Sequence, residues 1–422
     1  MPIIDDNNIS DLLQRTLNCV DPRLVDHGKR VAFIVSKMLQ TQNKYTLKEQ
    51  QQICFLALLH DIGAYKTEEI DQMVRFETED IWDHAVYGYL FIRYLSPLGA
   101  YAPAILLHHL NYDRMELVKT LDVSSLHKEI AQILFLADRV DIFRETYGNK
   151  KDELNSYLER SKDKRFSSEA VELFFHAEEK HHIMEGLDVP VDFQEMIGEI
   201  AFTREEVRMY IDMIVFTIDF RSEYTVTHTI TTTQIAYEAA RMMGLSEKAM
   251  HKIYYGAMLH DLGKIGIPVE ILEFPGKLSA QAMRVMQTHV DITAEILGNS
   301  FDHEVMRIAV RHHEKIDGSG YPNGLNAKEL SISERIVAVA DIVSALNGVR
   351  SYKDAFPKEK TLSIIGKMSE NGQLDTQAVD MITAHFDEIM ETVRERCKPV
   401  LETYDKLQAE YKTLMKQCKE AL

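Results

Sequence analysis

The most constraining feature of this sequence is a pattern of histidines and aspartates that occurs twice. In each half, a single histidine is followed by a His-Asp pair, another histidine, two adjacent histidines and an aspartate. The first set is His27, His60, Asp61, His84, His108, His109 and Asp138, and the second is His228, His260, Asp261, His289, His312, His313 and Asp341. Each second-half residue follows its counterpart by 200 to 205 residues, so the chain contains an internal repeat.

The segments around both His-Asp pairs have the signature of a helix. Thr46 and Ser246 are predicted N-caps, apolar residues follow at helical spacing, and Gly63 and Gly263 are predicted to end the two helices. Elsewhere apolar residues also recur mostly every three or four positions. We therefore predict an all-α fold with two tandem helical domains.

The predicted domains are residues 1–190 and residues 200–422. The boundary is placed near 186–200, where EGLDVPVDF supplies glycine, proline and polar residues between helical patterns. The second domain ends in a charged, roughly amphipathic stretch that is predicted to form a solvated helix with one face on that domain. A dimerising coiled coil is the alternative, although clean heptads are not sustained.

Composition narrows the classes of function. Hydrophobic residues make up 45% and charged residues 27% of the 422 residues, a balance typical of a globular protein with a sizeable core. The net charge of -18, without a long basic run, argues against a duplex nucleic acid partner. The four cysteines lack CxxC spacing, which argues against a zinc ribbon. No apolar stretch has the length of a membrane span and the N-terminus is unlike a secretory signal, so we expect a cytoplasmic protein without membrane association.

The repeated pattern is typical of a metal site. A lone histidine is more often a core or surface residue, and this reading suits His127, His251, His303 and His385. Imidazoles and carboxylates without a thiolate suit Fe, Mn, Co, Ni or Zn. Seven ligands exceed the needs of one ion, whereas two ions bridged by Asp261 would use them all. We expect two divalent transition-metal ions in the second half, Fe or Mn before Ni, Co or Zn, and a second metal site in the first half.

Three stretches of the second half resemble a known family. HDLGKIGIP, HHEKIDGSGYPNGL and ISERIVAVADIVSALNGVRSYKDA are similar to the motifs of the HD-GYP phosphodiesterases, a branch of the HD metal-dependent phosphohydrolase superfamily. The resemblance covers roughly residues 205–390. The first half resembles a plain HD domain, because HHLNYDR stands where the GYP loop would be.

The resemblance implies hydrolysis of a cyclic dinucleotide, cyclic di-GMP or 3',3'-cyclic GMP-AMP, to a linear dinucleotide or mononucleotides. It implies that the seven second-half residues listed above are metal ligands. Asp261, Lys264 and Lys353 are implied as catalytic residues, and Gly320, Tyr321, Pro322 and Arg335 as substrate-binding residues. Tyr224 stands where members with a third metal carry glutamate, which favours two ions.

Two other functions stay open for the whole chain. One is a general HD phosphohydrolase acting on nucleotides such as dNTPs or (p)ppGpp, and the intact GYP loop argues against it. The other is a non-catalytic cyclic-dinucleotide sensor, which need not keep a complete ligand set and both lysines. A homodimer or a signalling-protein partner also stays open.

The first domain has three readings: a second phosphohydrolase, a regulatory domain, or a scaffold stabilised by metal. Its ligand set is complete, but Ala64 stands at the position of Lys264. Lys150 follows Asp138 at the spacing at which Lys353 follows Asp341. We favour a regulatory or structural domain that binds metal.

Overall fold

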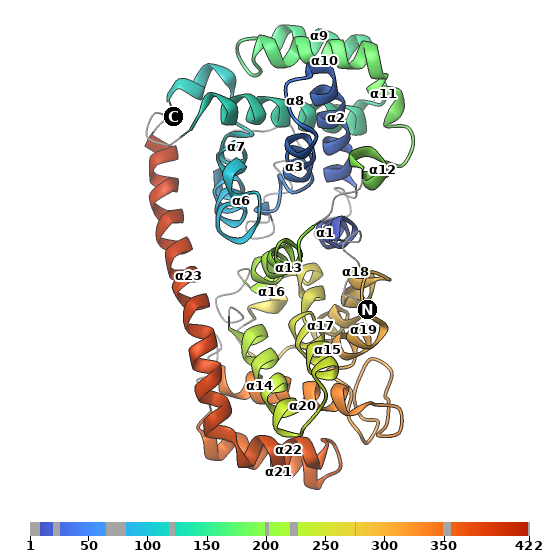
Figure 1. The fold of residues 1–422 in the computed structure, drawn as a ribbon, viewed down its shortest axis with the longest axis vertical. Helices are drawn as coiled ribbons and strands as arrows, with labels where there is room; N and C mark the ends of the chain where they lie inside the picture. Colours follow the sequence, from blue (N-terminus) through green and yellow to red (C-terminus); the bar gives the residue numbers. More distant parts are fainter. Residues whose placement is uncertain are drawn as a thin grey trace. The chain divides into compact units, whose positions relative to one another are not determined.

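The computed structural model describes residues 9–19, 26–64, 82–117, 123–198, 202–219, 227–274, 276–348 and 356–420. Within these ranges the chain is helical and forms no strand, so the predicted all-α class is confirmed (Figure 1). Tyr224 and Lys353, which the sequence singled out, lie outside the described residues.

The chain forms two compact units. The N-terminal unit contains Ile9–Met213 and the chain from Leu407 onward, and the C-terminal unit contains Ile214–Lys406. Two helices therefore have residues in both units, α13 (Arg204–Asp219) and α23 (Phe386–Glu420).

The end of α23 is grouped differently from the sequence-based division, which gave the whole C-terminal helix to the second domain. In the N-terminal unit, the Tyr411 ring stacks on Tyr87 of α6 (Trp82–Leu95) with ring centroids 4.3 Å apart. The Tyr411 hydroxyl bonds to Asp83, and the Tyr94 hydroxyl donates to Glu410 at 2.7 Å. The end of this long helix thus has contacts with residues more than three hundred positions earlier in the sequence.

The N-terminal unit is built around α2. Its other helices besides α6 are α1 (Ile9–Asn18), α2 (His27–Gln42), α3 (Leu47–Leu58), α7 (Ala102–Leu107), α8 (Ser125–Tyr147), α9 (Lys151–Ser161), α10 (Ser168–His181), α11 (Ile183–Gly186) and α12 (Phe193–Ile197). Helix α2 packs against α3, α8 and α10, and α7 packs against both α6 and α8.

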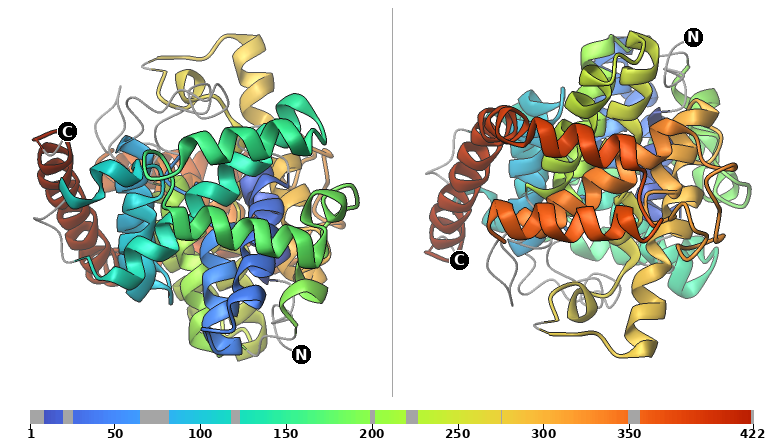
Figure 2. Two further views of the ribbon diagram at one scale, coloured as in Figure 1. Left: turned by 90° about the horizontal axis from the view of Figure 1, so that it is seen from above. Right: turned by 90° about the horizontal axis from the view of Figure 1, so that it is seen from below.

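The C-terminal unit repeats this arrangement around α14. Its helices are α14 (His228–Met242), α15 (Glu247–Met258), α16 (Val269–Leu272), α17 (Ala280–Gln287), α18 (His289–Leu297), α19 (His303–Val310), α20 (Ile332–Asn347), α21 (Lys358–Glu370) and α22 (Thr376–Ala384), with the 3-10 turn η5 (Leu262–Gly266). Helix α14 packs against α15 and α20, α15 against α19, and η5 against α18. Helices α16 and α17 contain no buried residue and lie at the outside of this unit (gold, Figure 2).

Local chemistry explains where the repeated helices begin. The Thr46 side chain accepts a hydrogen bond from the Glu49 N–H, and the Glu49 side chain accepts one from the Thr46 N–H, which is a capping box. Ser246 accepts from the Ala249 N–H in the same way. Both predicted N-caps are confirmed, and each sets the phase of the helix that leads to a His-Asp pair.

A glycine lets each His-Asp turn approach the following helix. A Cβ added to Gly263 would lie 1.9 Å from the His289 carbonyl oxygen, and one added to Gly63 would lie 1.9 Å from the His84 carbonyl oxygen. The Gly263 N–H also donates to Thr293 Oγ1 at 2.8 Å. This close backbone contact brings the His-Asp pair to the next histidine of the pattern.

We predict that Gly263→Ala destabilises the protein by about 2 kcal/mol or more, because the methyl group meets backbone that cannot rotate away. Thermal unfolding monitored by circular dichroism measures the change. Gly366→Ala in α21 is the matched control, since a Cβ there meets no atom within 4 Å. A Gly263→Ala protein as stable as the control would show that the contact relaxes freely.

Candidate metal centres

The seven histidines and aspartates of the second-half pattern lie close together in the structure. Six of them lie at or just after helix ends, and one lies inside a helix. His228 begins α14 and His289 begins α18, the His260-Asp261 pair follows the end of α15, and the His312-His313 pair follows the end of α19. Asp341 projects from within α20. All of them except His313 are largely buried, so the set forms one interior cluster.

Asp261 lies between two groups of imidazoles. Its Oδ2 is 3.1 Å from His260 Nε2 and 3.4 Å from His228 Nε2. Its Oδ1 is 3.5 Å from His289 Nε2 and 3.9 Å from His312 Nε2. One carboxylate therefore presents a different oxygen to each group, which is the arrangement a bridging ligand requires.

Asp341 complements the first group. Its Oδ1 is 3.1 Å from His228 Nε2 and 3.7 Å from His260 Nε2, and its Oδ2 is 3.5 Å from His313 Nδ1. The potential ligand atoms fall into two sets within 4.8 Å, His228 with His260 and Asp261, and His289 with His312 and His313.

The histidines are oriented by their own backbone. The Nδ1 atoms of His260, His289 and His312 lie 2.6, 2.7 and 2.6 Å from the carbonyl oxygens three residues earlier. A carbonyl only accepts, so each Nδ1 carries the proton and each Nε2 directs a lone pair into the cluster. The buried Nε2 of His260 has no hydrogen-bond partner among the described residues, and this donor set fits a divalent metal ion.

Burial and mutual repulsion keep these ligands in metal-binding form. Burial, followed by the neighbouring His313 and His260, holds the pKa of His312 well below its ordinary value. Burial lowers the pKa of His313 to about 4. Burial acts to raise the pKa of Asp261, but the charges of His260 and Lys264 outweigh it and hold that pKa well below its usual range. At neutral pH these imidazoles are neutral and this carboxylate is ionised.

Lys264 contacts the carboxylate at the centre of the cluster. Its Nζ lies 2.5 Å from Asp261 Oδ2, and the lysine side chain is 21% exposed. The lysine can thus reach solvent while remaining beside the cluster, and its role in catalysis stays a prediction.

The GYP loop is packed against the paired histidines. The Tyr321 ring lies 4.6 Å from the His313 ring, and the Tyr321 N–H donates to the His313 carbonyl at 3.2 Å. A Cβ on Gly320 would lie 2.5 Å from the Lys315 nitrogen and 2.6 Å from the His313 oxygen. Only glycine allows this approach, which sets the tyrosine beside the ligand cluster.

Glu314 binds the part of the GYP loop that follows Pro322. Its buried carboxylate accepts hydrogen bonds from the backbone N–H groups of Asn323 at 2.7 Å and Leu325 at 2.9 Å. The residue follows the two histidines directly, so it joins the ligand segment to the loop. Sequence reasoning missed this role, although the position beside His313 was the available signal.

The contacts of Arg335 are with protein groups. Its guanidinium donates to the Leu330 carbonyl at 3.0 Å and to the Ala327 carbonyl, and forms an ion pair with Asp375 at 3.0 Å. These bonds hold the segment that follows the GYP loop and the start of α22. A direct contact of Arg335 with substrate stays a prediction.

The N-terminal unit contains the same cluster. Asp61 Oδ2 is 3.3 Å from His60 Nε2 and 3.6 Å from His27 Nε2, while its Oδ1 is 3.7 Å from His108 Nε2. Asp138 Oδ1 is 3.4 Å from His27 Nε2. His84 and His109 complete a second set with Asp61 and His108, so every first-half residue of the pattern lies in this cluster.

Comparisons with known proteins agree with the duplication. Residues 24–142 and residues 208–378 each match a family described as HD domain. The chain is a tandem HD-domain protein. The two matches contain both histidine-aspartate clusters, and the second HD domain carries the GYP loop.

Curated relatives include two phosphodiesterases. The 3'3'-cGAMP-specific phosphodiesterase 1 of Vibrio cholerae is 28% identical over 393 residues, covering 88% of this chain and 89% of that protein. The cyclic di-GMP phosphodiesterase of Thermotoga maritima is 37% identical over 180 residues, 42% of this chain and 49% of that protein. The chain therefore spans most of the first relative and about half of the second.

A solved structure shares the fold of the tandem HD protein. The cyclic GMP-AMP specific phosphodiesterase V-cGAP3 of V. cholerae superposes with a TM-score of 0.58 at 20% identity, covering 90% of this chain and 97% of that one. Among the described residues no helix combines the length and hydropathy needed to cross a membrane.

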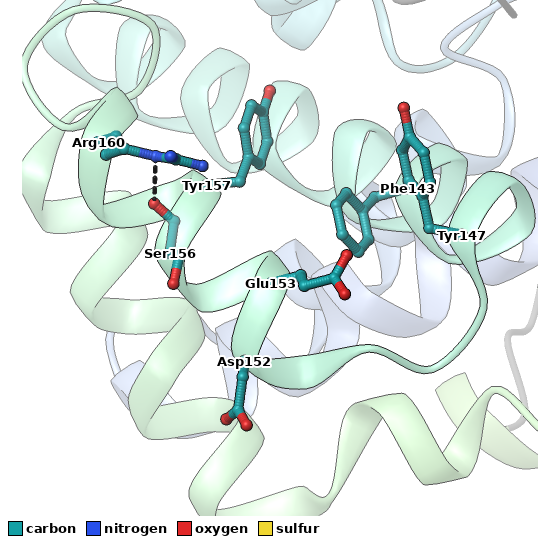
Figure 3. Close-up of a pocket in the computed structure, with 7 residues that line it drawn as sticks. All are labelled: Phe143, Tyr147, Asp152, Glu153, Ser156, Tyr157 and Arg160. Carbon is teal, nitrogen blue, oxygen red and sulfur yellow. Dashed lines mark hydrogen bonds between the residues drawn. The ribbon is translucent and has the colours of Figure 1, made fainter.

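The N-terminal unit also contains a cavity away from its histidine-aspartate cluster. It has a volume of about 580 Å³ and lies between α8 and α9, lined by Phe143, Tyr147, Tyr157, Asp152 and Glu153. The Glu153 carboxylate points toward the Phe143 ring, whereas the Asp152 side chain points away from the rings (Figure 3). None of its lining residues belongs to the histidine-aspartate cluster. The cavity is thus a separate feature of this domain.

We predict that Glu314→Ala exposes the GYP loop. Removing a buried carboxylate that accepts two N–H groups costs about 1–3 kcal/mol, so amide hydrogen exchange at Asn323 and Leu325 should accelerate roughly tenfold to a hundredfold. Glu329→Ala is the control, because Glu329 accepts from Asn326 in the same loop and leaves these two bonds intact. Unchanged amide exchange at Asn323 and Leu325 in the Glu314 variant would show that the Glu314 carboxylate does not hold the loop.

Proposed function

We propose that the C-terminal HD domain is a metal-dependent phosphodiesterase that hydrolyses a cyclic dinucleotide, cyclic di-GMP or 3',3'-cyclic GMP-AMP, to a linear dinucleotide or mononucleotides. The observation that carries the proposal is the position of Asp261 between two imidazole groups, with Lys264 and Tyr321 beside the same cluster. The names of the relatives in V. cholerae and T. maritima support this substrate class.

Two divalent ions, Fe or Mn in preference to Ni, Co or Zn, are the proposed cofactors of this domain. The first would be held by His228, His260, Asp261 and Asp341, and the second by Asp261, His289, His312 and His313. Bound there, the ions would supply an activated water and neutralise phosphoryl charge. The distinct positions of the two Asp261 oxygens support this assignment.

The protein side chains have separate tasks in the reaction. Lys264 lies 2.5 Å from Asp261, so its ammonium is in position to pair with a phosphate oxygen that replaces this contact. Lys353 is proposed as a second such cation. Tyr321 offers a ring face for a base, and Gly320 and Pro322 shape its loop.

The N-terminal HD domain is proposed to have a regulatory or structural role. Its cluster has the same ligand types, but Ala64 is buried where the C-terminal domain has Lys264. It also lacks a GYP loop, since Leu110 and Asn111 follow its paired histidines. These two differences support assigning turnover to the C-terminal domain.

Turnover by charge-removing variants tests the assignment. With Mn²⁺ or Fe²⁺ supplied, Asp261→Asn should lower hydrolysis of both cyclic dinucleotides by about a thousandfold or more, because the bridging charge is lost. Asp61→Asn is the matched change in the other domain and should retain turnover. Chromatography of the products measures both. Loss of activity only in Asp61→Asn would move the reaction to the N-terminal domain, and binding without turnover in the wild type would indicate a sensor.

Variants of Tyr321 test the loop. Tyr321→Ala should lower kcat/KM by about tenfold to a hundredfold, because stacking of a base on an aromatic ring is worth about 1–3 kcal/mol. Tyr321→Phe keeps the ring and should remain near wild type. Steady-state kinetics with both substrates measures the effect. Unchanged kcat and KM in the alanine variant would show that Tyr321 does not take part in substrate binding.

A further inference from the structure

The two metal-ligand clusters differ in the residue that follows the last aspartate. Arg139 follows Asp138 on α8, and its Nε and Nη2 both donate to Asp138 Oδ2, at 2.8 and 2.6 Å. The arginine is fully buried. At the C-terminal cluster Ile342 takes this place, and the Oδ2 of Asp341 faces His313 Nδ1 at 3.5 Å.

The bound guanidinium lies on one side of the N-terminal cluster. The Oδ2 that it holds is the Asp138 oxygen that faces His109, with Nδ1 of that histidine 3.7 Å away. Arg139 and His109 also share a neighbour, because the Phe135 ring lies 5.9 Å from the Arg139 Cζ and 5.8 Å from the His109 ring. The positive charge is thus beside the set formed by Asp61, His84, His108 and His109.

The other side of the cluster keeps its ligand atoms. Asp138 Oδ1 still faces His27 Nε2 at 3.4 Å, and Asp61 Oδ2 still faces His27 and His60. His27 Nδ1 lies 2.7 Å from Asp141, and Arg30 donates to that carboxylate at 2.7 Å. A carboxylate behind a ligating histidine orients the ring and strengthens it as a metal ligand. In the C-terminal domain the corresponding position is a hydroxyl, Ser344, 2.9 Å from His228 Nδ1.

We infer that Arg139 takes the place of one metal ion in the N-terminal HD domain, so that this cluster holds a single ion through His27, His60, Asp61 and Asp138. A guanidinium does not lose its proton and this one has no exposed surface, so it cannot withdraw when a second cation arrives. Repulsion between like charges is strong in a buried site, which disfavours an ion at the set containing His109. Lys264 differs, because its side chain is 21% exposed and can leave Asp261.

A single ion beside a fixed guanidinium limits the chemistry open to the N-terminal domain. Two metal ions that share a carboxylate can bind the nucleophile and a phosphoryl oxygen at the same time. A single ion beside a fixed guanidinium cannot change its position to bind both groups. The inference concerns metal content and holds whichever nucleotide the C-terminal domain hydrolyses.

The experiment measures Mn²⁺ in the full-length chain. Asp261→Ala combined with His289→Ala removes ligands from both halves of the C-terminal cluster and leaves the N-terminal cluster intact. Elemental analysis should then find one Mn²⁺ per chain, and electron paramagnetic resonance should show an isolated Mn²⁺ spectrum. Two ions per chain with an exchange-coupled spectrum would overturn the inference.

Further variants in this background locate the ion and test the arginine. His27→Gln should lose the remaining Mn²⁺ and His84→Gln should retain it, and the opposite result would overturn the assignment. Arg139→Ile, which copies Ile342, should raise the content to two coupled ions, and a folded Arg139→Ile protein that binds only one would refute the role of the arginine. If Arg139→Ile does not fold, as judged by circular dichroism, the two histidine variants decide the question alone.

Discussion

The burial of two ionised aspartates among histidines is the constraint on which each HD domain depends. A buried carboxylate without a partner is costly, so Asp261 and Asp341 must be surrounded by groups that compensate their charge. A cation bound among these histidines would supply that compensation, which explains why the cluster suits a metal ion. Helix ends satisfy the geometry, because residues at a terminus can point away from the helix axis toward a common centre.

The backbone takes part in this arrangement as much as the side chains do. The carbonyl groups that fix the tautomers of His260 and His312 belong to the last turns of α15 and α19, where carbonyls lack a helical partner. One bond therefore satisfies a helix end and orients a ligand. Gly263 allows the turn η5, which follows the first of these helix ends, to contact α18 directly. The stability of the helices and the geometry of the site are thus set by the same few contacts.

The clustering of the repeated histidines and aspartates could be predicted from the sequence, because the same order of residues occurs in both halves. The all-α class and the N-caps at Thr46 and Ser246 follow from local patterns. The partners of His27 and His228 were not predicted, since Asp141 and Ser344 become visible only when the faces of α8 and α20 are known. The grouping of Tyr411 with α6 depends on contacts between residues more than three hundred positions apart, which local periodicity cannot show.

The two domains show how one scaffold can solve the same charge problem with different residues. In the C-terminal domain a lysine beside Asp261 compensates charge and can move toward solvent, so the cluster remains open to an anionic ligand. In the N-terminal domain a buried arginine compensates Asp138 permanently, and a second arginine compensates Asp141. Permanent compensation stabilises the fold but fixes the electrostatics of the site. Under the proposed assignment, this difference would separate a domain for turnover from a domain for structure or regulation, although both keep the complete set of histidines and aspartates.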